Sequence, residues 1–89
     1  MELEELREQI DLVDRELIAL LERRMDISAQ ISDWKRKAGA PILDMAREEA
    51  KLASVRTMCR ESTADGIADV FREIMAASRA LQAERMRGD

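Results

Sequence analysis

A long run of apolar residues at helical spacing, beginning at Leu3, constrains this chain more than any other feature. Its members alternate in steps of three and four with a gap at Arg24, which is the period of one helix face. They are Leu3, Leu6, Ile10, Val13, Leu17, Leu20, Ile27, Ile31 and Trp34. The pattern stops before Gly39 and Pro41, because glycine favours a helix C-terminus and proline prevents the helix from continuing.

The predicted first helix therefore covers about 34 residues and about 50 Å. A chain of 89 residues has no room to fold back along the whole of so long an element. A domain of this size also buries only a modest fraction of its unfolded surface. The long apolar face therefore needs a partner, and we expect the chain to oligomerise.

Two shorter helices are predicted after the first break. Asp44 precedes the second helix and can cap it, and a second break is expected at residues 61–66, which are rich in turn formers. The apolar faces carry Met45, Leu52, Val55 and Cys59 in the second helix and Ile67, Val70, Phe71, Ile74, Met75 and Leu81 in the third. With 38% charged and 2% aromatic residues, the composition favours helices over sheets. We predict one all-α domain over residues 1–89, with one long and two shorter helices.

Charge and composition exclude several classes of protein. The net charge of −4 offers no broad positive face to a nucleic acid or an anionic membrane. No apolar run approaches the roughly 20 residues that span a bilayer, and the first residues do not look like a secretory signal. The single cysteine, Cys59, has no partner for an intrachain disulfide. The expected compartment is the cytoplasm.

Polar residues interrupt the apolar face of each predicted helix. They are Arg24 and Lys35 in the first, Glu48 in the second, and Ser78 and Gln82 in the third. Each alone is compatible with a salt bridge or a satisfied core group, but five together indicate a pocket between the helices. Arg24 and Lys35 lie within about 20° of each other around the helix and about 16 Å apart along it. A small anion would fit between them.

The residues available restrict the chemistry of this pocket. The chain has no histidine, and Cys59 has no evident base, so nucleophilic and histidine acid–base mechanisms lack their usual groups. No ligand set for a metal and no glycine-rich phosphate loop is present, so neither a metal nor another cofactor is expected. The remaining route is electrostatic, in which fixed donors hold an anion and stabilise charge that develops in the transition state.

In order and spacing, these residues resemble the all-helical, or AroQ, class of chorismate mutases. The resemblance rests on residues 6–11 with Asp14, residues 20–24, Lys35, residues 41–44, Arg47, Glu48, Phe71 and residues 78–82. It implies an intertwined helical-bundle homodimer. It also implies a Claisen rearrangement of chorismate to prephenate in aromatic amino-acid biosynthesis, which needs no proton transfer, covalent intermediate or cofactor.

The resemblance also implies a role for each site residue. Arg7 and Arg24 would pair with the two substrate carboxylates, with Arg47 in support, because guanidinium groups bind carboxylates bidentately. Lys35 and Gln82 would donate hydrogen bonds to the ether oxygen, and these two would matter most for the rate. Glu48 and the Asp44 backbone would hold the ring hydroxyl, and Ser78 would lie near a carboxylate. Two of these roles have an alternative. Asp44 could be a purely structural helix cap, and Arg47 could form an ion pair with Glu48 or Asp44. Arg23 and Arg79 are expected to be surface charges.

Arg7 raises a problem of distance. It lies seventeen residues before Arg24, or about 25 Å along one helix, which is too far for both side chains to clasp one small dicarboxylate. If both contact the same substrate, the first helices of two subunits must run antiparallel, so that Arg7 of one approaches Arg24 of the other. Each active site would then be shared between the subunits of a homodimer.

Three alternatives remain at this point. Mutases acting on 4-amino-4-deoxychorismate are the nearest, because Glu48 can accept a hydrogen bond from a hydroxyl or an ammonium group. Isochorismate-pyruvate lyases share the fold and basic pocket. A non-catalytic helical dimerisation module is the third, but it predicts apolar or exposed residues at Arg24, Lys35 and Gln82. The sequence holds no further catalytic or regulatory domain, so we expect a stand-alone enzyme.

Overall fold

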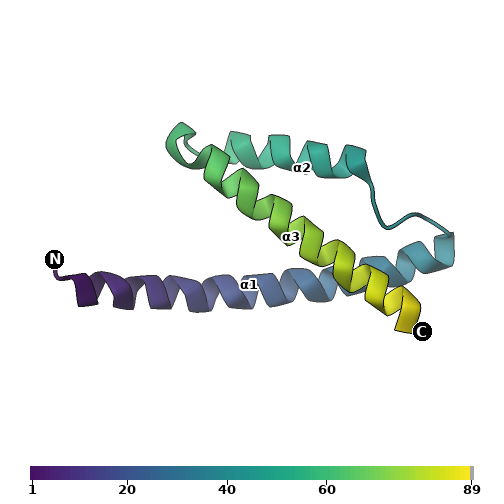
Figure 1. The fold of residues 1–89 in the computed structure, drawn as a ribbon, viewed down its shortest axis with the longest axis horizontal. Coiled ribbons are helices and arrows are strands. Elements are labelled where there is room, and N and C mark those ends of the chain that lie inside the picture. The colour runs from purple at the N-terminus through teal and green to yellow at the C-terminus, as the bar shows by residue number, and fades with distance from the viewer. Residues whose placement is uncertain (89) are drawn as a thin grey trace.

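The chain forms three α-helices, as the sequence predicts (Figure 1). The computed structural model describes residues 1–88. Helix α1 covers Leu3–Ala38, α2 covers Met45–Met58 and α3 covers Glu61–Gly88. The all-α prediction of one long and two shorter helices is confirmed.

The predicted end of the first helix is also confirmed. Gly39 has a left-handed backbone with φ of 68°, and its N–H donates to the Arg36 carbonyl. The N–H of Ala40 donates to the carbonyl of Lys35 at 2.9 Å. These two bonds satisfy carbonyl groups that the last turn of a helix otherwise leaves unpaired, and glycine adopts the required φ without a steric cost.

Asp44 caps α2 as predicted. Its Oδ1 accepts a hydrogen bond of 3.0 Å from the backbone N–H of Arg47, which has no partner within the helix itself. The segment between α1 and α2 therefore ends at a defined point, and Asp44 and Glu48 start the second helix on the side that faces the pocket described below.

The predicted break at residues 61–66 is wrong. α3 already begins at Glu61, and only Cys59 and Arg60 separate it from α2. The polar groups that suggested a turn support the first turns of the helix: Thr63 donates from both its N–H and its hydroxyl to the Arg60 carbonyl. Asp65 pairs with Arg56 at 2.5 Å, and this hydrogen bond and the charge of Arg56 lower the pKa of Asp65. Cap and turn residues are the same types, so composition alone does not separate the two.

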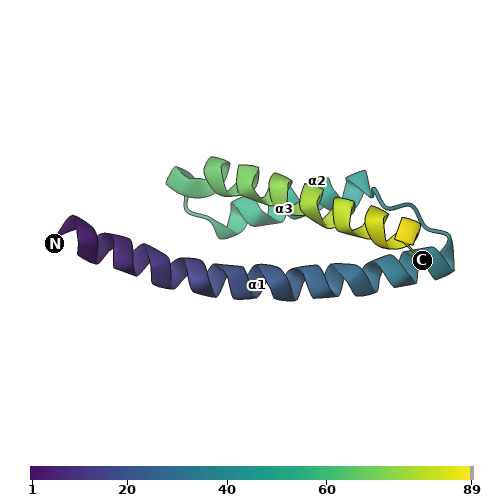
Figure 2. The same cartoon turned by 60° about the horizontal axis from the view of Figure 1, so that its bottom comes forward.

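α3 packs against both other helices, and α1 extends well beyond it (Figures 1 and 2). Its buried side chains recur every seven residues, at Ala68, Met75 and Gln82. Val55 of α2 joins this small core, whereas the buried residues of α1 are Ser28 and Ser32. The interior of one chain is thus small and partly polar.

Most of the predicted apolar face of α1 is left uncovered by the residues that the structure describes. Residues 1–20 are all exposed, and Figure 2 shows this end of α1 running past the other two helices. Ile10 and Val13 are 59% and 61% exposed, and Trp34 is 65% exposed. Ile67 and Val70, expected on the inner face of α3, are exposed as well. None of the described helices combines the length and the apolar character needed to cross a membrane.

Candidate active site

A pocket of about 400 Å³ is lined by residues of all three helices. Seven of the eight predicted site residues line it. They are Arg24, Lys35, Asp44, Arg47, Glu48, Ser78 and Gln82. Ile27, Ile31, Ile42 and Met75 supply the apolar part of its wall. The predicted residues thus line one pocket, although they lie as far apart in the sequence as Arg24 and Gln82.

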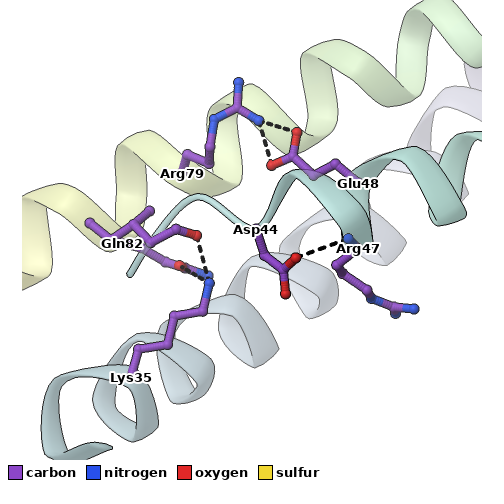
Figure 3. A network of polar contacts seen from close by, with 7 residues as sticks. Lys35, Asp44, Arg47, Glu48, Arg79 and Gln82 are labelled. Carbon is purple, nitrogen blue, oxygen red and sulfur yellow. Dashed lines mark hydrogen bonds and ion pairs between the residues drawn. The ribbon is translucent and has the colours of Figure 1, made fainter. Parts of the chain in front are cut away.

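Lys35 and Gln82 come together at one end of the pocket (Figure 3). The Lys35 Nζ donates to the Ile42 carbonyl at 2.6 Å and to Gln82 Oε1 at 3.5 Å. Gln82 is 5% exposed, so its amide is held in place by the protein rather than by solvent. The ammonium group has three N–H donors, and these two contacts leave one for a ligand.

Two serines of α1 hold Gln82 from the other side. Gln82 Nε2 donates to Ser28 Oγ at 3.0 Å and to the Ser28 carbonyl at 3.4 Å, and Ser32 Oγ donates to the Gln82 carbonyl at 3.3 Å. Ser28 Oγ also bonds Ser78 Oγ. Sequence reasoning missed both serines of α1. The signal was their position, since Ser28 follows Arg24 by four residues and Ser32 follows Ser28 by four.

The prediction that Arg79 is a surface charge is wrong. Its Nη1 lies 2.5 and 2.6 Å from the two carboxylate oxygens of Glu48, which joins α3 to α2 across the pocket wall (Figure 3). Glu48 is therefore paired with Arg79 and not with Arg47. Arg47 bonds Asp44 through its backbone N–H, and its guanidinium group points away from both carboxylates in Figure 3. Arg23 is exposed and outside the pocket, as expected for a surface charge.

The charge of the pocket is opposite to that of the whole chain. Five cationic side chains line it, Arg24, Lys35, Arg47, Lys51 and Arg79, against the two carboxylates of Asp44 and Glu48. The lining thus has an excess of three positive charges, whereas the chain has a net charge of −4. A low-dielectric cleft lined by one sign of charge concentrates ligands of the other sign, so this pocket suits a small dianion.

Lys51 and Arg79 are the two cations that sequence reasoning missed. Both sit at helical spacing from residues that it identified. Lys51 follows Glu48 by three residues, and Arg79 precedes Gln82 by three. The face of a helix is wide enough to hold two adjacent residues, here Ser78 and Arg79, and only Ser78 was predicted to line the pocket.

Arg7 is not in the pocket. Its side chain is 63% exposed and pairs with Glu4 on the same turn of α1, at 3.0 Å. Both residues lie on the uninterrupted helix α1, and its rise places Arg7 about 25 Å from Arg24. One chain therefore brings together the predicted site without Arg7. Within residues 1–88, no cluster of three or more histidine, cysteine or carboxylate side chains is placed to hold a metal ion.

Comparisons with known proteins agree with this geometry. Residues 6–83 match the family described as chorismate mutase type II. The chain is 40% identical over 82 residues to a T-protein of Enterobacter agglomerans and 39% identical over 78 residues to a T-protein of Haemophilus influenzae, covering 86% and 85% of its length. It spans only about a fifth of each T-protein, 21% in both cases.

A relative of similar size is the chorismate mutase of Methanocaldococcus jannaschii. It is 30% identical over 83 residues, which cover 90% of this chain and 83% of that protein. No solved structure matches the chain significantly. The family match covers most of the chain, including Arg24, Lys35, Glu48 and Gln82 of the pocket. This chain belongs to the type II, all-helical family of chorismate mutases.

Proposed function

We propose that this protein rearranges chorismate to prephenate, a step of aromatic amino-acid biosynthesis, at the pocket between its three helices. The observation that carries the proposal is the meeting of Lys35 and the buried Gln82 in a cavity with an excess of positive charge. Chorismate is a dicarboxylate, and the cavity of about 400 Å³ is of the size that holds small ligands.

The reaction requires hydrogen-bond donors at the ether oxygen of the substrate, and these residues can supply them. In a Claisen rearrangement the ether carbon–oxygen bond breaks while a new carbon–carbon bond forms within the same molecule, so no proton leaves and no second reactant enters. Negative charge grows on the ether oxygen as its bond breaks. A preorganised donor at that oxygen binds the transition state more tightly than the ground state and so accelerates the reaction. The third N–H of Lys35, which the contacts with Ile42 and Gln82 leave for a ligand, is the first such donor.

Gln82 becomes the second donor after a rotation of its amide. In the structure both N–H groups of Nε2 are directed to Ser28, and Oε1 faces Lys35. Turning the amide about its soft terminal torsion would place Nε2 beside Lys35, where the ether oxygen would lie, and Oε1 would then accept from the Ser28 hydroxyl. Ser28 therefore serves both arrangements without leaving a buried polar group unpaired.

The other groups bind the parts of the substrate that do not react. Arg24 pairs with one carboxylate, with Arg47 in support and Ser78 near a carboxylate. Glu48 and the Asp44 backbone hold the ring hydroxyl. The second carboxylate is left for Arg7 of the partner subunit, because the Arg7 of the same chain lies too far from Arg24. Holding both carboxylates fixes the substrate in the compact shape from which the new bond can form.

The same proposal includes a homodimer in which two α1 helices run antiparallel. The exposed apolar face of α1 supports it, since monomeric proteins rarely expose so long an apolar surface. The shape supports it as well. The radius of gyration of one chain is 16.1 Å, whereas a compact domain of this length has about 12 Å. An antiparallel pair would bury the face and bring Arg7 of one subunit to Arg24 of the other.

A direct assay tests the proposal. The protein is incubated with chorismate, isochorismate or 4-amino-4-deoxychorismate, in each case with excess chelator, and both substrate loss and product identity are followed. We expect chorismate to give prephenate without any added cofactor. Preferential use of either of the other two substrates, or activity that chelation abolishes and a metal restores, would contradict it.

A further inference from the structure

The ion pair between Glu48 and Arg79 lies between the main pocket and a second pocket. Both residues line the main pocket, and both also line the second pocket, which has a volume of about 360 Å³ and lies between α2 and α3. One nitrogen, Nη1 of Arg79, contacts both oxygens of Glu48 at 2.5 and 2.6 Å. The side chains are 35% and 24% exposed, so the contact is shielded from solvent more than the pairs of Arg7 with Glu4 and of Arg72 with Asp69. Shielding makes an ion pair more effective.

We propose that Arg79 is a positioning residue that makes the site select a ring hydroxyl over a ring amine. The inference rests on the proposed function, in which Glu48 accepts a hydrogen bond from the ring substituent of the substrate. A carboxylate alone does not choose between the two, because it can accept from a neutral hydroxyl or from an ammonium group. The charges around the carboxylate determine whether a hydroxyl or an ammonium group binds better there.

Arg79 removes the electrostatic advantage that a cation would have at Glu48. An unpaired, half-buried carboxylate attracts an ammonium group strongly. With the Arg79 guanidinium in contact with both oxygens, the pair has no net charge. Arg47 and Lys51 on the same helix as Glu48 add positive charge to the pocket, and the carboxylate of Asp44 offsets this charge only in part. An ammonium group would therefore meet repulsion, whereas a hydroxyl is almost indifferent to these charges.

The geometry leaves Glu48 able to bind the hydroxyl. Each carboxylate oxygen has about two lone-pair sites, and Arg79 uses one on each oxygen. The contact also fixes the orientation of the carboxylate, because Arg79 is anchored on α3 and Glu48 on α2. Glu48 is thus held as a preoriented acceptor that bears no uncompensated charge.

The test compares kcat/KM for chorismate and for 4-amino-4-deoxychorismate in four proteins. They are the unmodified protein, Arg79→Gln, Arg79→Lys and Arg72→Gln. Arg72 is the matched control, because it lies two turns earlier on α3, pairs with the exposed Asp69 and lines only the second pocket, not the main one. We expect the unmodified protein to prefer chorismate and Arg79→Gln to shift the ratio of the two kcat/KM values toward the amine by about tenfold or more. Arg79→Lys and Arg72→Gln should keep the original preference.

The ratio distinguishes this role from a structural one. Loss of folded protein lowers both kcat/KM values equally and leaves their ratio unchanged. An Arg79→Gln protein that is impaired equally with both substrates would overturn the inference, and it would point to direct binding of a substrate carboxylate if both KM values rise. If Arg79→Gln does not fold, the ratio of the two kcat/KM values is compared between the unmodified protein and Arg79→Lys. A preference for chorismate in both proteins supports the inference, and equal use of the two substrates by the unmodified protein overturns it. Failure of the proposed function is recognised separately, because the unmodified protein would then not convert chorismate.

Discussion

Replacing Lys35 by alanine tests the electrostatic mechanism at its centre. The side chain is half-buried, and its ammonium group is held by the Ile42 carbonyl at 2.6 Å and by Gln82 Oε1 at 3.5 Å. It is thus a donor fixed before the substrate arrives. Removing one such donor from a catalytic site costs about 3–4 kcal/mol of transition-state stabilisation, which corresponds to a loss of about 10²–10³ in kcat.

The effect on folding is smaller and can be separated. A hydrogen bond from a charged donor contributes about 1.5–3 kcal/mol, and the partial exposure of Lys35 places its bond to Ile42 at the lower end of that range or below. Lys35→Met loses the same bonds but keeps the apolar stem. Lys37→Ala is a matched control, because Lys37 is exposed on the same last turn of α1 and does not line the pocket.

The assay measures kcat at saturating chorismate, with circular dichroism to verify the helical fold. Lys35→Ala and Lys35→Met should both lose about 10²-fold or more in kcat while remaining helical, and Lys37→Ala should behave like the unmodified protein. A Lys35→Ala protein with unimpaired turnover would refute the assignment of Lys35 to the ether oxygen. A rise in KM alone would reassign it to ground-state binding.

Three further predictions follow from single contacts. Gln82→Glu should become more active as the pH falls, because only the protonated acid can donate to the ether oxygen; a pH-independent rate would show that residue 82 does not face it. Asp65→Asn should lower the melting temperature at pH 7, because Arg56 lowers the pKa of Asp65 in the folded chain and the pair therefore stabilises the fold above the ordinary pKa of 3.8. This difference should vanish as the pH falls through the lowered pKa, and a difference that persists in strong acid would contradict it. Gly39→Ala should destabilise the fold by about 1–2 kcal/mol in chemical denaturation, because φ is 68° there, while no neighbouring atom meets the added methyl group. An unchanged stability would show that the left-handed turn is not needed.

The elements set by local interactions could be predicted from the sequence. The end of α1 at Gly39 and the start of α2 at Asp44 depend on backbone conformation and on one hydrogen bond within four residues. The stride of each helix then placed Lys35 and Gln82, forty-seven residues apart, in one pocket. The start of α3 was predicted wrongly because Thr63 and Asp65 suit a helix cap as well as a turn, and only the contact of Asp65 with Arg56 on α2 distinguishes the two.

The parts that were missed depend on how two helices face each other. Ser28 is an unremarkable small residue in the sequence, and it gains a role only because α3 approaches α1 closely enough for Gln82 to reach its hydroxyl. Arg79 and Glu48 are thirty-one residues apart and on different helices, so no local pattern connects them. Helix periodicity gives the face of a residue, but the choice between solvent and a partner on that face depends on the crossing of the helices.

The shared active site is the central claim, and complementation between two inactive variants tests it most directly. Arg7→Ala and Arg24→Ala proteins are unfolded together, refolded and assayed with chorismate, and the heterodimers are identified by a size tag on one of the two chains. In a heterodimer one site carries both substitutions and the other carries neither, so activity should reappear at roughly a quarter of that of the unmodified protein if half of the dimers are mixed. Heterodimers that form without any recovery of activity, or a monomer that is fully active at the assay concentration, would contradict a site built from two subunits.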